Sequence, residues 1–277
     1  MIGLMAAVLL SLSAVQTPEG PAGVLDVQRT TDAAGDRRLF VSETELAVLD
    51  PGAEGRQINR LRFEIETLAA APGGLTLRYR LLDASLTDSR NPGLEPLLKA
   101  WVGVDVAFSA DASGRPIDLM DWPSVRDAYA ARLQAVGLDE PARVKVLGDL
   151  EMLPAGARVS MILGDMALLA DMQPRRPVTA GRFDQPFERQ GDLARSATLS
   201  VSPAPDGCGL SLTRSLSVEN AGGAGPADIV RQDISSTLHV IDGWSSEVTR
   251  KTTTSGRVNS VETVRVFRDP RPTCPAS

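Results

Sequence analysis

The spacing of apolar residues changes twice along this chain of 277 residues, and this order of spacings restricts the fold more than any other feature of the sequence. Before about residue 120, apolar and polar residues alternate, which is typical of β-strands with one face in water. Between about residues 121 and 172 apolar residues recur at helical spacing, and after residue 177 the alternation returns. We therefore predict an α+β fold, in which a large twisted or curved antiparallel β-sheet packs this central helical segment on one face.

The clearest alternation predicts a hairpin in the N-terminal part. Leu61, Phe63 and Ile65 share one side of a predicted strand, and charged residues occupy the other side. Residues 75–81 repeat the pattern after the turn Ala-Pro-Gly-Gly at residues 71–74. Two such runs joined by turn residues favour antiparallel pairing, with opposite charges facing each other across the outer surface.

The central segment carries signals for the ends of three helices. Asp121 can cap the first helix, and Gly137 follows its last periodic residue. Asp139 opens a second helical stretch, and Pro154 opens a third that extends through Leu169. Asp is a favoured N-cap, and Pro is tolerated in a first helical turn.

The sequence near the two ends of the chain predicts where the folded domain begins and ends. Residues 1–14, MIGLMAAVLLSLSA, are too short for a membrane-spanning helix, which needs about 20 residues, and they are typical of a signal peptide. We expect residues 15–23 to be a flexible start of the mature chain, residues 24–268 to be a single α+β domain, and residues 269–277 to be a C-terminal tail. This predicts an exported protein, periplasmic or extracellular, with no integral membrane span in the mature chain.

The two cysteines of the chain are consistent with an oxidising compartment. Cys208 and Cys274 are an even pair in a chain with an export signal, so we predict a disulfide that ties the C-terminal tail to the domain. The alternative is two unrelated buried thiols.

The composition argues against several kinds of chemistry. The chain has one histidine, His239, in a segment that alternates like a strand, and it has no G-x-S-x-G motif. Asp111-Ala112-Ser113-Gly114 reads as a turn. We expect no catalytic residue, metal or cofactor, and an enzyme is the less favoured class. Because charges of both signs are interspersed, the sequence also disfavours a nucleic-acid partner.

At the level of element order, the chain resembles the periplasmic carriers of lipoproteins and lipids, which also wrap a sheet around helices. This resemblance implies a non-enzymatic protein that binds a lipid or other hydrophobic molecule between sheet and helices. The apolar strand faces and the methionine-rich helices supply the predicted lining, for which ordinary core packing is the alternative. The predicted ligand-binding residues are Leu77, Tyr79, Leu81, Val104, Val106, Phe108, Met161 and Met166.

A second function remains open. The C-terminal strands are rich in Ser and Thr, and their sheet edge can pair with a strand of another protein. The alternative prediction is therefore a structural or protein-interaction module of the cell envelope, with an envelope protein as its partner.

Overall fold

The computed structural model describes residues 23–25, 32–171, 173–174, 178–190, 193–204, 209–220, 230–241, 243–256 and 258–273. The predicted signal peptide, both cysteines and the end of the predicted tail lie outside these residues. The strands within the described ranges are β1 (Val24–Leu25), β2 (Arg37–Val48), β3 (Gly55–Ala71), β4 (Gly74–Asp88), β5 (Asp105–Asp111), β6 (Pro116–Leu119), β7 (Val178–Thr179), β8 (Gly181–Gln190), β9 (Leu193–Pro203), β10 (Leu210–Asn220), β11 (Val230–Val240), β12 (Ser245–Ser255) and β13 (Ser260–Arg268).

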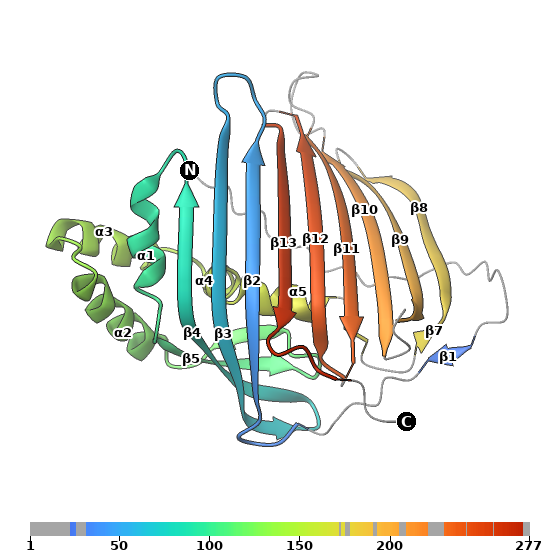
Figure 1. Cartoon of the computed structure of the whole chain (residues 1–277), viewed down its shortest axis with the longest axis horizontal. Helices are drawn as coiled ribbons and strands as arrows, with labels where there is room; N and C mark the ends of the chain where they lie inside the picture. The colour runs from blue at the N-terminus through green and yellow to red at the C-terminus, as the bar shows by residue number, and fades with distance from the viewer. Residues whose placement is uncertain are drawn as a thin grey trace.

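Eleven of these strands form one sheet in the order β6-β5-β4-β3-β2-β13-β12-β11-β10-β9-β8 (Figure 1). Each neighbouring pair is antiparallel. The pairing of β2 with β13 joins the strands that precede the helical segment to those that follow it. The predicted large antiparallel sheet is therefore confirmed, while β1 and β7 pair separately.

The predicted hairpin is formed by β3 and β4. Ile65 lies opposite Tyr79, and two register shifts interrupt the pairing, one of them next to Phe63. Phe63 stacks between Phe40 of β2 and Tyr79, with ring centroids 5.4 Å and 5.0 Å apart. Directly paired residues share a face of a sheet. We call the face that carries these aromatic side chains the inner face, and the opposite one the outer face.

The helices are η1 (Pro92–Leu94), α1 (Glu95–Lys99), α2 (Trp122–Ala135), α3 (Glu140–Glu151), α4 (Ala155–Ile162) and α5 (Gly164–Asp171). The predicted caps of α2 and α3 are confirmed, because Asp121 and Asp139 accept hydrogen bonds from backbone N–H groups at 3.4 Å and 2.8 Å. The predicted third helix is instead two helices. They are separated at Leu163, where the backbone leaves helical geometry (φ −115°, ψ 24°) next to Gly164, a poor helix former.

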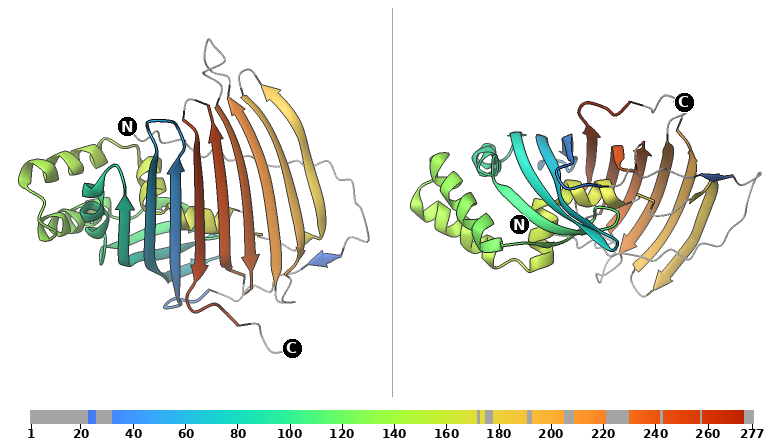
Figure 2. Two further views of the ribbon diagram at one scale, coloured as in Figure 1. Left: turned by 45° about the horizontal axis from the view of Figure 1, so that its top comes forward. Right: turned by 90° about the horizontal axis from the view of Figure 1, so that it is seen from below.

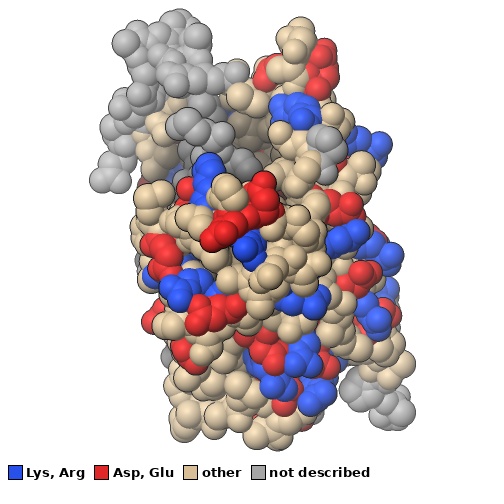
Figure 3. Space-filling model, turned by 90° about the vertical axis from the view of Figure 1, so that its left-hand side faces the viewer, with Lys and Arg blue, Asp and Glu red and all other residues tan. Residues whose placement is uncertain are grey.

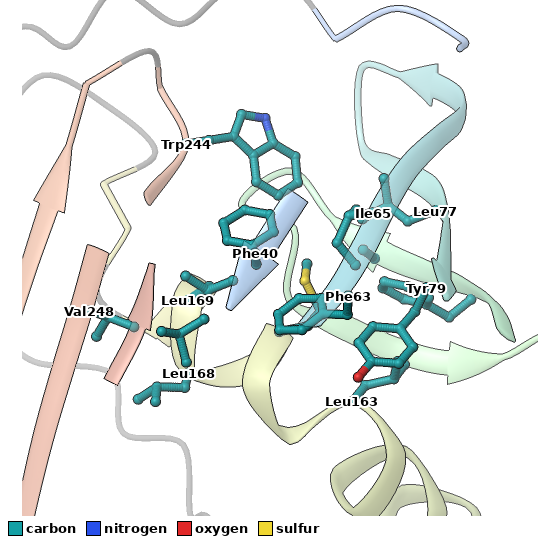
Figure 4. Packing of buried hydrophobic residues seen from close by; sticks show 14 of the residues in the cluster. Phe40, Phe63, Ile65, Leu77, Tyr79, Leu163, Leu168, Leu169, Trp244 and Val248 are labelled. Carbon is teal, nitrogen blue, oxygen red and sulfur yellow. The ribbon is translucent and has the colours of Figure 1, made fainter. Parts of the chain in front are cut away.

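The helices pack through two groups of buried side chains, one shared with the sheet and one among the helices themselves. In the main core, Leu163, Met166 and Leu169 lie with the inner-face residues of the strands (Figure 4). A smaller cluster contains Tyr129 and Leu133 of α2 with residues of α1 and α3. Figures 1 and 2 show α2 and α3 beyond the β4 and β5 end of the sheet. The packing of the whole segment 121–172 on one face stays a prediction.

The outer face carries ion pairs between neighbouring strands. Examples are Arg56 with Glu45 at 2.8 Å and Arg60 with Glu43 at 3.4 Å, both linking β2 and β3. Exposed pairs of this kind stabilise by only about 0–1 kcal/mol each. Figure 3, which views the left-hand side of Figure 1, likewise shows acidic and basic side chains interspersed. On the outer face of β2 and β3, paired charges of both signs therefore face the solvent.

The turn between β5 and β6 contacts the centre of the molecule. Asp111 accepts hydrogen bonds from the Ser113 backbone N–H at 2.8 Å and from the Ser113 hydroxyl at 2.6 Å, as expected of a turn. Gly114 has φ +82°, and a Cβ there would lie 3.0 Å from the ring of Trp244. This turn therefore needs glycine both for its backbone conformation and for its closeness to a buried tryptophan.

Candidate functional site

The predicted ligand-binding residues lie mainly in the interior. Seven of them are buried members of the main core, on β4, on β5 or just before it, and on α5. Met161 of α4 is the exception, with 44% of its surface exposed. Burial, together with the charge of Asp165, raises the pKa of Tyr79 well above its ordinary value. The structure thus gathers seven of the eight residues in the packed core that sheet and helices share. Their contact with a ligand stays a prediction.

Helix α5 crosses the inner face with a carboxylate near each end. At its start, Asp165 accepts a hydrogen bond from the Ser42 hydroxyl of β2 at 2.9 Å. Burial raises the pKa of Asp165 above its ordinary value, while the Ser42 hydrogen bond and the Arg250 guanidinium oppose this rise. An ionised Asp165 is therefore held in an environment that disfavours its charge.

The carboxylate at the other end, Asp171, is shared by two arginines. Arg115, from the turn between β5 and β6, donates to it at 3.1 Å, and Arg214 of β10 donates to its second oxygen. Asp165 and Asp171 therefore hold separate partners at opposite ends of α5. Among the described residues, no group of three or more His, Cys, Asp or Glu could hold a metal ion.

Asp171 binds one transverse line of inner-face residues through Arg214, and Asp165 interacts with the same line through the charge of Arg250. In the register of the sheet, Arg250 of β12, Val264 of β13, Thr44 of β2 and Asn59 of β3 are successively paired. Arg214 belongs to the same line, because it pairs through β11 with the position opposite Arg250. We call Thr44, Asn59, Arg214 and Arg250 the polar row. It borders the core, since the next inner-face residues include the buried Leu212, Leu238, Val248 and Val266.

Beyond Arg214 the inner face carries apolar side chains again, with Gln185 and Arg195 among them. Five half-buried side chains of β8, β9 and β10 lie there on the same face as the buried Leu212. Phe183 and Leu199 also pack against the main core. We call this group the inner patch, and its residues are Phe183, Ala197, Leu199, Leu216 and Val218.

Other residues singled out by the sequence do not join this site. His239 lies on the outer face of β11, paired with Glu247 of β12. Cys208 and Cys274 lie outside the described residues, so their bridge stays a prediction. In the part of the chain that the structure describes, no helix is both long enough and apolar enough to cross a bilayer.

Sequence reasoning missed the polar row, although a signal for it exists. In β10, Arg214 occupies an inner position between Leu212 and Leu216, where the alternation calls for an apolar residue. Arg250 follows Val248 in the same way on β12. A charged residue at a core-facing position of a strand needs a partner, and it therefore marks a candidate site.

Comparisons with known proteins do not assign a function to this site. No family model matches the sequence. The tRNA modification GTPases MnmE of Synechococcus elongatus and Thermosynechococcus vestitus are each 26% identical over 144 residues, which is 47% of this chain. The chain spans less than a third of these curated relatives, with 30% of each covered. The sequence has no G-x-x-x-x-G-K-[ST] loop for binding phosphates.

One solved structure is similar to most of the chain. It is described as lipid-protein interactions in lipovitellin, with 12% sequence identity and a TM-score of 0.43. The similarity covers 87% of this chain and 25% of that one. A TM-score of this size does not establish a common fold.

Proposed function

We propose that this is an exported, non-enzymatic protein that binds a lipid or another amphiphilic molecule on the inner face of its sheet. The observation that carries the proposal is the inner patch, because its apolar side chains continue the inner face of the core yet stay only half-buried. Burying such surface against an apolar chain is favourable by about 25 cal/mol per Å². The charged side chains of the polar row border the patch and suit the polar end of an amphiphile.

The earlier predictions fit into this proposal. The helical segment of about residues 121–172 would pack on the inner face and border the ligand on the inner patch, while the predicted lining residues of β4 and β5 would belong to the packed core beside it. Export is supported by the leader-like residues 1–14 and by the cysteine pair.

A matched pair of variants tests the proposal. Leu216→Asp places a charge in the inner patch, whereas Ser215→Asp places the same charge at the neighbouring exposed position on the outer face. Binding of radiolabelled oleate to the full chain is measured by equilibrium dialysis, with circular dichroism as the check on folding. We expect Leu216→Asp to lose binding and Ser215→Asp to keep it. Equal binding by the two folded variants, or no binding by the unmodified protein, would contradict the proposal.

The alternative function, an envelope interaction module, depends on a free sheet edge. One edge strand is β8, which contains Pro186, a residue without an N–H to donate, and the exposed ion pair of Arg182 with Asp184. Proline and charged side chains on an edge strand are devices that oppose pairing with another chain. The other edge strand, β6, has only four residues. These features favour the amphiphile over a partner strand.

A further inference from the structure

Three members of the polar row have a buried polar atom without a hydrogen-bond partner. These atoms are Nε of Arg214, Nε of Arg250 and Oδ1 of Asn59. They are three of the six such atoms found among the described residues. Buried donors and acceptors are nearly always satisfied in native proteins, by protein groups, water or a ligand. Their concentration in one line across the inner face therefore points to a missing polar partner at that line.

The two arginines of the polar row are only partly paired with acids. Arg115 and Arg214 share the single carboxylate of Asp171, so two guanidinium groups face one acid at this end of α5. Arg250 is paired once, with Glu262 at 3.2 Å, and both side chains are 35% exposed. An anion at this line would accept hydrogen bonds from the unpartnered Nε donors of Arg214 and Arg250.

The spacing of the two arginines suits an anionic group of small size. Arg214 and Arg250 occupy strands that are separated by β11, so their backbones are about 9–10 Å apart. Guanidinium groups on long side chains can converge across this distance, and their planar donors match carboxylate and phosphate oxygens. The inner patch begins directly beyond Arg214, where the apolar chain attached to such a group would lie.

We propose that Arg214 and Arg250 bind the anionic head group, a carboxylate or phosphate, of the amphiphile whose apolar chain lies on the inner patch. The inference rests on the proposed function and names the class of its ligand. Arg214 is the better residue to replace, because Asp171 keeps Arg115 as a partner when Arg214 is removed.

The test compares ligands with the same chain and different head groups. Affinities for oleate and for monoolein, which is neutral, are measured with the full chain and with Arg214→Gln, Arg214→Lys and Arg60→Gln. Arg60 is the matched control, since it is an ion-paired arginine on the outer face. We expect Arg214→Gln to weaken oleate binding about tenfold, equivalent to about 1.4 kcal/mol, and to leave monoolein unaffected. Arg214→Lys should weaken oleate binding less, and Arg60→Gln should not change it.

Each other outcome has a distinct meaning. Equal loss of oleate and monoolein, or no loss of either in the folded variant, overturns head-group recognition while the proposed function stands. Failure of the unmodified protein to bind either ligand overturns both. Inorganic phosphate is titrated alone by calorimetry. Phosphate binding that depends on Arg214, without oleate binding, would identify a site for a free anion and overturn the inference for an amphiphile.

Discussion

Leu77→Ala and Leu216→Ala should separate the packed interior of this protein from its ligand-binding surface. Leu77 of β4 is fully buried, next to Phe108 in the pairing of β4 with β5. Truncating such a leucine costs about 2–5 kcal/mol, through lost burial and the cavity left behind. Leu216 is half-buried on β10, so its truncation should cost only about 1 kcal/mol, roughly half the value of a fully buried side chain.

The assay measures stability and binding on the same samples. Urea unfolding followed by tryptophan fluorescence gives the free energy of unfolding, and equilibrium dialysis gives the affinity for oleate. We expect Leu77→Ala to lose most stability and to keep its affinity under conditions where it is folded. Leu216→Ala should show the reverse, with a small loss of stability and a clear loss of affinity.

The opposite result would refute this reasoning. If Leu77→Ala bound oleate more weakly while its unfolding free energy stayed unchanged, a ligand rather than a helix would occupy the space beside Leu77. The predicted lining of Leu77 and its neighbours would then be the binding site, and the inner patch would be an ordinary part of the sheet surface.

Three further predictions concern the fold. Burial raises the pKa of Asp165 above 3.8, so the protonated carboxyl group contributes its full stability below pH 3.8. This contribution is lost as the pH rises through the raised pKa. Asp165→Asn should thus gain stability relative to the unmodified protein as the pH rises above 3.8, and urea titrations showing no such gain would contradict this. Gly209→Ala should destabilise the protein far more than Gly137→Ala. Both glycines have positive φ (+81° and +87°), but of the two only Gly209 would bring a Cβ against a backbone oxygen, at 1.8 Å. Equal melting temperatures of the two variants would contradict this prediction. Burial raises the pKa of Tyr129 to about 12 and that of Tyr79 well above 10.0, so the ultraviolet absorbance of the native protein should show neutral phenols at a pH where the denatured chain is ionised.

Local sequence patterns predicted the individual elements of this fold but not how distant elements meet. The alternation at residues 61–65 and the caps at Asp121 and Asp139 act over a few residues, and each is confirmed. The pairing of β2 with β13 joins segments more than 200 residues apart, and alternation carries no information on which strands are neighbours. Helical periodicity also continued through Leu163, because the break between α4 and α5 depends on backbone angles rather than on apolar spacing.

The candidate site was less predictable for the same reason. Apolar lining residues such as Leu77 and Phe108 look alike whether they pack on helices or bind a ligand. The charged members of the polar row become meaningful only when the register places Arg214 and Arg250 on the inner face and α5 brings Asp171 to Arg214.

The half-buried state of the inner patch follows from the sizes of sheet and helices. Eleven strands spaced about 4.8 Å apart make a sheet about 48 Å wide, whereas α4 and α5, with eight residues each, are each about 12 Å long. Helix α5 contacts β12 and binds Arg214 of β10, and Phe183 and Leu199 of the next two strands pack at the edge of the main core. Leu199 and Phe183 keep the apolar alternation there. Leu25 of β1 and Val178 of β7 also pack against the main core, and an amphiphile held by Arg214 would cover the apolar surface that stays half-buried.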